Sequence, residues 1–219
     1  MRVWGPGGYY YLVGQAFPPA NPDCRMYYRR RLPHVLPDLA DGTYLFVTWR
    51  LAGSLQKFHP GVWSPKVTPG NIFVSQDREM DKAAYGPTWL KDAKIARVVA
   101  EALIQGESEW LLYELRAWVI MPNHVHAIIR PQAPLSKIMR WLKGSTAKQA
   151  NKILNRTGEP FWQGESFDHR VRDLFGLERV VRYVEYNPVA AGLVSRAELW
   201  PWSSAGLAGG NACPTKLSP

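Results

Sequence analysis

The sequence predicts an α+β domain, in which a ferredoxin-like antiparallel sheet carries helices on one face. Segments rich in aromatic and β-branched residues indicate strands, because these side chains suit a pleated, half-buried surface. Longer segments with apolar residues at i, i+3, i+4 and i+7 indicate helices with one buried face. Their order along the chain is strand, helix, strand, strand, helix, strand, which is typical of the ferredoxin-like fold.

The first half of this pattern contains three strands and one helix. Residues 43–51, T-Y-L-F-V-T-W-R-L, are predicted to form a strand near the middle of the sheet. A helix is predicted over residues 88–105, ended by Gly106. The second strand is predicted over residues 110–120, and a turn at Met121-Pro122-Asn123 leads into the third strand.

The rest of the pattern is a helix and a strand, and one more helix follows it. A helix with one apolar stripe is predicted over residues 135–154. Residues 161–172 are expected to contain a last short strand at the sheet edge. A final helix is predicted over residues 174–187, with Leu177, Val180, Val181 and Val184 on its buried face.

The predicted domain spans residues 42–204, which leaves a segment at each end. Residues 1–41 are rich in proline and are expected to form an irregular arm, and residues 205–219 a flexible tail. Gly53 to Gly70 contains three prolines and is expected to be a loop, longer than compact domains usually keep without a purpose.

Composition and charge limit the class of partner. The 219 residues are 46% hydrophobic, enough for one core, and the net charge of +9 favours a polyanion such as nucleic acid. A membrane partner is not expected, because no run of about 18 apolar residues exists to span a bilayer. Without a secretory signal, and with Cys24 and Cys213 forming neither a metal pattern nor a disulfide framework, we expect a cytoplasmic location.

Two histidines stand two residues apart in the third predicted strand. Side chains at this spacing point to the same face of a strand, so His124 and His126 lie side by side while Val125 points away. Two adjacent imidazoles can hold one metal ion. The same spacing also suits a pair of hydrogen-bonded core histidines.

The last predicted helix carries a tyrosine and an asparagine beside its buried face. At about 100° per residue, Tyr183 projects to the border of the apolar stripe, whereas Tyr186 points toward solvent. Asn187 lies one turn beyond Tyr183 on the same side. Tyr183 could equally be a tyrosine at the core boundary, and Asn187 before Pro188 could be an ordinary helix terminator.

Basic side chains recur in two other places. The predicted helix at residues 135–154 has several cations and no acidic residue, which suits contact with a phosphate backbone as well as a solvated face. The segment Y-Y-R-R-R-L-P at residues 27–33 mixes aromatic rings with positive charge, as single-strand binders do, but also suits a solvated surface segment.

The histidine and tyrosine segments together resemble the HUH endonucleases, and most closely the REP-associated tyrosine transposases. The resemblance covers about residues 43–204. Its recurrent segments appear in order: M-P-N-H-V-H at 121–126, K-G-S-T-A-K-Q-A-N at 143–151, F-W-Q-G-E-S-F-D-H-R-V-R-D at 161–173, Y-V-E-Y-N-P-V-A-A-G-L-V at 183–194 and W-P-W-S-S at 200–204. The Pro-rich arm and the Gly53 to Gly70 loop depart from the family pattern.

The resemblance implies an HUH endonuclease fold and a metal-dependent DNA strand transferase. It implies that Tyr183 is the nucleophile, forming a covalent 5′-phosphotyrosine, and that His124, His126 and Asn187 bind the metal. Because oxygen ligands favour hard ions, Mg²⁺ or Mn²⁺ is expected. The implied substrate is single-stranded DNA that forms hairpins at repetitive extragenic palindromes, bound by a monomer or a homodimer. The DNA contacts expected are Arg130, Arg140, Lys143, Lys148, Arg170 and Arg172.

Two other functions are considered from the sequence. The chain could be a hairpin-binding module with the same fold and no catalytic turnover. A metallohydrolase of the barrel type fits poorly, because the chain is short for an eight-stranded barrel and further carboxylate or histidine ligands are not evident.

The role of His169 also remains open. It could be a third metal ligand, a DNA contact or a surface histidine.

Overall fold

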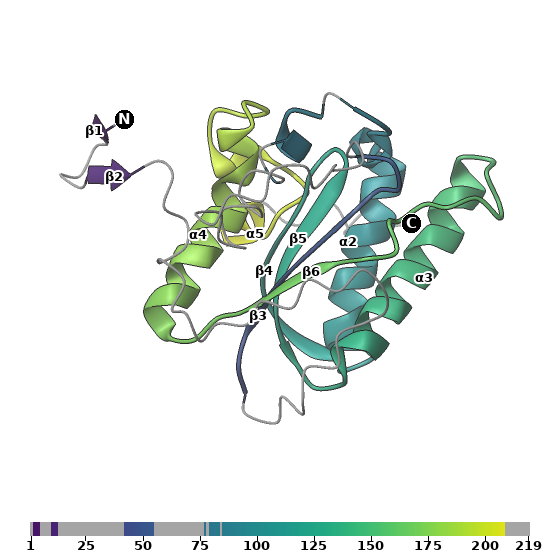
Figure 1. Cartoon of the computed structure of the whole chain (residues 1–219), viewed down its shortest axis with the longest axis horizontal. Helices are drawn as coiled ribbons and strands as arrows, with labels where there is room; N and C mark the ends of the chain where they lie inside the picture. Colours follow the sequence, from purple (N-terminus) through teal and green to yellow (C-terminus); the bar gives the residue numbers. More distant parts are fainter. Residues whose placement is uncertain are drawn as a thin grey trace, which may run out of the picture.

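The chain folds in the predicted element order around one four-stranded sheet (Figure 1). The computed structural model describes residues 2–4, 10–12, 42–54, 77, 79–83 and 85–208. The elements of the central domain are β3 (Leu45–Arg50), α2 (Ala93–Ser108), β4 (Tyr113–Ile120), β5 (His124–Pro131), α3 (Leu135–Ile153), β6 (Phe167–Arg170) and α4 (Leu174–Ala190).

The sheet has the strand order β4-β5-β3-β6, and each neighbouring pair is antiparallel. β3 therefore lies in the middle and the short β6 at an edge, as predicted. In the pairing of β3 with β5, Thr48 lies opposite His126 and Arg50 opposite His124. The histidines thus sit on an inner strand, which fixes the backbone on both sides of them.

Helices cover both faces of the sheet. α2 and α3 pack on one face, against Leu45, Val47 and Trp49 of β3. α4 packs on the opposite face, where Phe46 contacts its apolar stripe. Figure 1 shows α4 on one side of the sheet and the other two helices on the far side. The expectation of helices on one face thus holds for the ferredoxin-like pair α2 and α3, and α4 forms a third layer.

Two predicted helix ends are wrong. α2 continues through Gly106 to Ser108, because the glycine lies against the buried ring of Tyr113 and leaves room for it. α4 continues past Asn187 and Pro188 to Ala190. Proline lacks one N–H, but the amide of Ala191 still donates to the Asn187 carbonyl at 2.9 Å, so the last turn survives.

The segment after α4 closes the free edge of β4. The amide of Ile120 donates to the Trp202 carbonyl at 2.8 Å, and the amide of Ser204 donates to the Trp118 carbonyl at 2.9 Å. The side chain of Ser204 also donates to Glu185 of α4 at 2.9 Å. These bonds connect α4 to the edge strand and satisfy backbone groups that would otherwise be unpaired.

The terminal segments differ in part from expectation. β1 (Arg2–Trp4) and β2 (Tyr10–Leu12) form an antiparallel pair inside the predicted irregular arm. A short helix, α5 (Ala205–Ala208), opens the predicted tail. The segment at residues 27–33, both cysteines and most of the Gly53 to Gly70 loop lie outside the described residues. In the described part of the chain, none of the helices has the length and apolarity to cross a membrane.

Candidate metal and tyrosine site

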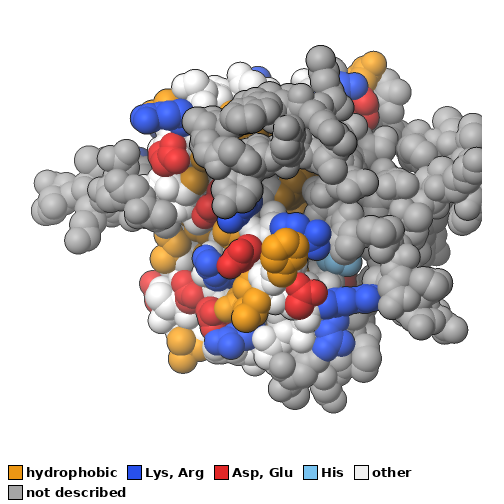
Figure 2. Space-filling view, turned by 90° about the vertical axis from the view of Figure 1, so that its left-hand side faces the viewer, with side chains coloured by type: hydrophobic (Ala, Val, Ile, Leu, Met, Phe, Trp, Pro, Cys, Tyr) orange, Lys and Arg blue, Asp and Glu red, His pale blue; other side chains and the backbone are white. Residues whose placement is uncertain are grey.

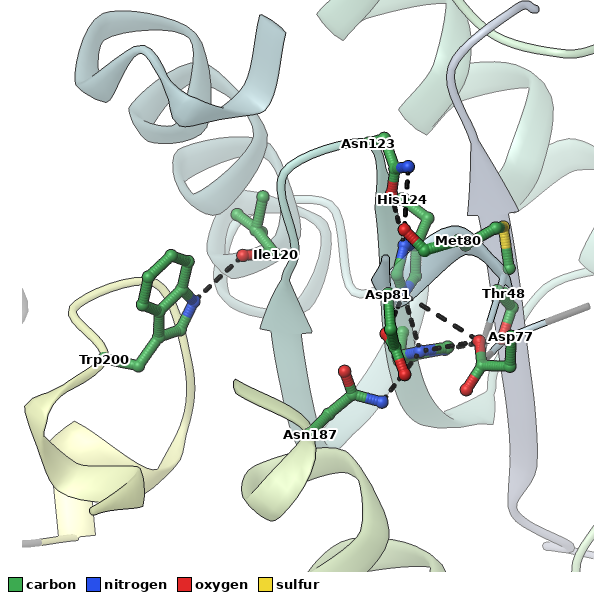
Figure 3. Close-up of polar contacts among 10 residues, drawn as sticks. Thr48, Asp77, Met80, Asp81, Ile120, Asn123, His124, Asn187 and Trp200 are labelled. Carbon is green, nitrogen blue, oxygen red and sulfur yellow. Dashed lines mark hydrogen bonds and ion pairs between the residues drawn. The ribbon is translucent and has the colours of Figure 1, made fainter. Parts of the chain in front are cut away.

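His124 and His126 lie side by side on the face of the sheet that α4 covers. Their Nε2 atoms are 3.0 Å apart, and neither side chain is exposed to solvent. Figure 3 shows the polar contacts around the pair, and the ring of His126 also stacks on Phe46 with centroids 5.4 Å apart. This confirms that the two imidazoles share one face, which the two-residue spacing predicts.

Hydrogen bonds at the Nδ1 atoms orient both rings. Nδ2 of Asn123 donates a hydrogen bond to the Met80 carbonyl at 2.9 Å. Oδ1 of Asn123 therefore faces Nδ1 of His124 at 2.7 Å and accepts a hydrogen bond from it. His124 therefore presents a lone pair at Nε2. Thr48 Oγ1 lies 2.7 Å from Nδ1 of His126 and can accept from that atom in the same way. Such partners are typical of histidines that ligate metals.

Burial keeps His124 uncharged. Burial, together with the nearby His126, lowers the pKa of His124 to about 3. Its imidazole is therefore neutral at neutral pH, which is the form that binds a metal ion.

α4 brings two further side chains to the histidines. Nδ2 of Asn187 lies 3.4 Å from Nε2 of His126. Asn187 is buried, and among the described residues its Oδ1 has no hydrogen-bond partner. The ring centroid of Tyr183 lies 5.9 Å from that of His126 and 6.0 Å from that of Phe46. Tyr186, in contrast, is 59% exposed.

Two carboxylates come from the segment at residues 77–81. Asp77 Oδ1 lies 3.2 Å from Nε2 of His126 and 3.8 Å from Nε2 of His124. Asp81 Oδ1 lies 3.7 Å from Nε2 of His124. Burial raises the pKa of Asp77, but His126, His124 and Asn187 together outweigh burial and hold that pKa below its usual value. Burial and the charge of Asp77 raise the pKa of Asp81 to about 7.

The donor set fits a divalent cation. Ligand atoms of Asp77, His124 and His126 all lie within 4.8 Å of one another. Within the described part of the chain, neither oxygen of Asp77 has a hydrogen-bond partner. Lone pairs of the imidazoles and of the Asp77 carboxylate repel one another unless a proton or a metal cation lies between them. Mixed nitrogen and oxygen ligands of this kind suit several divalent metals.

Sequence analysis missed Asp77 and Asp81. The signal available was their spacing of four residues, which places them on one side of a helical turn, and residues 77 and 79–81 are helical. Nothing in the sequence indicated that this turn would lie against the histidine strand, because the preceding residues contain no strand or long helix pattern.

The cations expected to contact DNA do not form one cluster. Arg140, Lys143 and Lys148 belong to α3, on the face of the sheet away from the histidines. Lys143 is directed to backbone, since Nζ donates to the carbonyls of Gln163 at 2.6 Å and Gly164 at 2.9 Å. Burial lowers the pKa of Lys143 to about 8.

The remaining expected cations lie at the sheet end remote from His124. Arg130 forms an ion pair with Glu114, and Arg170 donates to Thr43 Oγ1 at 3.1 Å. Arg172 is exposed just beyond β6. The face on which α4 lies carries both signs of charge and apolar groups together (Figure 2). A uniformly basic surface is therefore not seen on the described part of this face.

His169 lies on β6 opposite Phe46, on the same face as the histidine pair. Burial, followed by the charge of Arg172, lowers its pKa. His169 is absent from the group of close ligand atoms, which contains only Asp77, His124 and His126 among the described residues. Among the described residues, Asp77 rather than His169 therefore lies with the histidine pair.

Comparisons with known proteins agree with this arrangement. Residues 88–187 match the family described as transposase, IS200 like. The chain is 29% identical over 93 residues to the REP-associated tyrosine transposase of Escherichia coli strain K12, which covers 42% of this chain and 54% of that protein. It is also 29% identical over 103 residues to a putative REP-associated tyrosine transposase of Haemophilus influenzae, covering 42% of this chain and 58% of that protein.

A solved structure shares the fold. The structure of a REP-associated tyrosine transposase bound to a REP hairpin matches with a TM-score of 0.51 and 20% identity, over 89% of this chain and 92% of that one. The chain spans just over half the length of the curated relatives it matches. These matches confirm the resemblance and the fold class predicted from the sequence.

Proposed function

We propose that this chain, whose residues 88–187 match the IS200-like transposases, is a divalent-metal-dependent DNA endonuclease and strand transferase that uses one tyrosine as its nucleophile. One observation supports this most strongly: α4 holds Tyr183 and Asn187 beside the imidazole of His126 on β5. The sequence places these groups on separate elements, so only the tertiary fold could bring them together.

The metal site would be formed by two histidines whose orientations are already fixed and by Asn187. His124 and His126 present Nε2, because their Nδ1 atoms are directed to Asn123 and Thr48. Asn187 turns Nδ2 toward His126, and rotation of its amide would present Oδ1, which has no hydrogen-bond partner among the described residues. Bound there, Mg²⁺ or Mn²⁺ would orient a scissile phosphate and stabilise charge on the leaving oxygen.

Tyr183 supplies the nucleophile. Its oxygen attacks phosphorus and loses the phenolic proton, while the bond from phosphorus to the 3′ oxygen breaks and that oxygen takes up a proton. The products are a 5′-phosphotyrosine and a free 3′-hydroxyl. Because one phosphodiester replaces another, little bond energy is lost, and the reverse step joins strands without a nucleotide cofactor. A covalent intermediate of this kind divides one exchange into two steps.

Hairpin-forming single-stranded DNA is the proposed substrate. A relative of the same fold is bound to a REP hairpin. The net charge of +9 favours a polyanion by counterion release. The expected contacts at Arg130, Arg170 and Arg172 lie along one end of the sheet, whereas those on α3 lie on the other face. A hairpin that engages both groups would have to pass around the edge of the sheet.

The proposal is tested by incubating the full chain with hairpin DNA and Mn²⁺, then denaturing the mixture on a gel. We expect a protein–DNA adduct that disappears with Tyr183→Phe and with EDTA. Tyr186→Phe is the matched control, since Tyr186 lies one turn away and faces solvent. Hairpin binding without an adduct in the wild type would instead make the chain a binding module.

A further inference from the structure

The carboxylate of Asp77 is buried beside the two histidines. Its residue is 1% exposed, and within the described residues neither oxygen has a hydrogen bond. Burying an ionised carboxylate costs free energy unless a positive group compensates it. The groups nearest to it are two imidazoles, with Nε2 of His126 at 3.2 Å and Nε2 of His124 at 3.8 Å. A divalent cation held by these imidazoles would compensate the charge of the carboxylate.

The charge of this carboxylate matters for the order of binding. Two imidazoles and an amide are neutral, so an ion held by them alone would keep two positive charges in a buried site, which is costly. With one carboxylate, a single positive charge remains. A phosphodiester carries one negative charge and would bring the assembly to neutrality. The carboxylate therefore reduces the cost of holding the ion before DNA arrives.

We infer that Asp77 is a direct ligand of the divalent ion and that it allows the ion to bind the DNA-free protein. This inference rests on the proposed function, and it adds a carboxylate to the two histidines and the asparagine. Asp77 stands at the start of the helical residues 77–81, so metal binding would also fix this segment against β5. The ion would thus be in place when the scissile phosphate enters.

A different role for Asp77 predicts other behaviour. Its Oδ1 lies 3.2 Å from Nε2 of His126, so it could serve as the counter-ion of a protonated imidazole. In that case the ion pair would stabilise the metal-free fold, and breaking it would lower stability. A ligand behaves in the opposite way, because a carboxylate facing lone pairs destabilises the fold until a cation binds.

The test is a calorimetric titration of Mn²⁺ into the metal-free full chain, without DNA, using wild type, Asp77→Asn and Glu79→Gln. Glu79 is exposed, paired with Lys82 and only two residues away, so it controls for loss of a nearby negative charge. We expect wild type to bind one Mn²⁺ and Asp77→Asn to lose about 10-fold or more in affinity. Glu79→Gln should stay within about 2-fold of wild type. In EDTA, Asp77→Asn should unfold at or above the wild-type temperature.

Three results would overturn the inference. They are a wild type that does not bind Mn²⁺ without DNA, an Asp77→Asn protein with unchanged affinity, and an Asp77→Asn protein that is less stable than wild type in EDTA. The first result needs no variant and so holds even if Asp77→Asn fails to fold. Adduct formation with hairpin DNA at saturating Mn²⁺ reports the proposed function separately, because it requires Tyr183 whether or not Asp77 is a ligand.

Discussion

Nδ2 of Asn187 lies 3.4 Å from Nε2 of His126, although 61 positions separate these residues in the sequence. Asn187 belongs to α4 and His126 to an inner strand, so this contact forms where the helix packs on the sheet. The same helix places Tyr183 one turn before Asn187, beside the same imidazole. One helix therefore positions both the proposed nucleophile and a proposed metal ligand.

Replacing Asn187 should weaken use of the metal more than binding of DNA. Asn187→Ala removes the buried Oδ1, and we expect adduct formation at limiting Mn²⁺ to fall about 10-fold. Hairpin affinity in EDTA should be unchanged, because the side chain is buried. Glu178→Gln, an exposed change on the same helix, serves as the control. Equal loss of hairpin affinity would show that Asn187 contacts DNA instead.

His124 should lower the stability of the metal-free protein as the pH falls below neutrality, in opposition to Asp81. The pKa of folded His124 is about 3, whereas the unfolded imidazole has a value of 6.5. Between these values only the unfolded chain takes up the proton, so the free energy of unfolding falls by up to about 1.4 kcal/mol per pH unit.

Denaturant unfolding in EDTA from pH 7 to pH 4 measures this effect. His124→Gln should show a shallower fall than wild type. Asp81, whose pKa is raised to about 7, contributes the opposite slope in both proteins and so does not create the difference. Parallel profiles for the two proteins would show that His124 takes up a proton in the folded state.

The junction between α4 and the edge strand should contribute measurably to stability. Ser204 Oγ accepts from the Trp118 amide at 3.1 Å and donates to Glu185 at 2.9 Å. Ser204→Ala leaves that amide without its side-chain partner, so we expect a loss of about 1 kcal/mol in urea unfolding. Ser195→Ala, an exposed change in the preceding loop, should have no measurable effect. Equal stability of the two variants would show that the Ser204 hydrogen bonds do not contribute measurably to stability.

Two helical glycines should respond oppositely to alanine. A Cβ at Gly106 would lie 2.6 Å from Cζ of Tyr113, whose ring is buried, so Gly106→Ala should cost about 1–3 kcal/mol. Gly144 in α3 has nothing within 4 Å of the same position. Gly144→Ala should therefore stabilise the protein by about 0.5–1 kcal/mol. Similar unfolding midpoints for both variants would show that the α2 contact with Tyr113 is loose.

The sequence predicted those parts of the site that depend on local periodicity. Alternation along a strand was enough to put His124 and His126 on one face, and the helical period was enough to put Tyr183 at the border of its stripe. The face of the sheet that α4 covers was not predictable in this way. An apolar stripe shows that a helix is buried but not against which side of a sheet.

Asp77 was missed because its position depends on tertiary structure alone. It belongs to a short helical turn, and the sequence around it has no pattern that indicates a partner. The end of α4 was misjudged for a different reason. The residue before proline usually avoids the helical region, but packing of Val184 and Pro188 in the core holds Asn187 in the helix.

The most direct test of the proposed chemistry is to identify the residue that carries DNA. The adduct formed with Mn²⁺ and hairpin DNA would be digested with nuclease and trypsin, and the modified peptide sequenced by mass spectrometry. The account predicts a 5′-phosphate ester on Tyr183 and an unmodified Tyr186 in the same helix. An ester on Tyr186 or another residue, or hairpin cleavage without any phosphotyrosine, would contradict it.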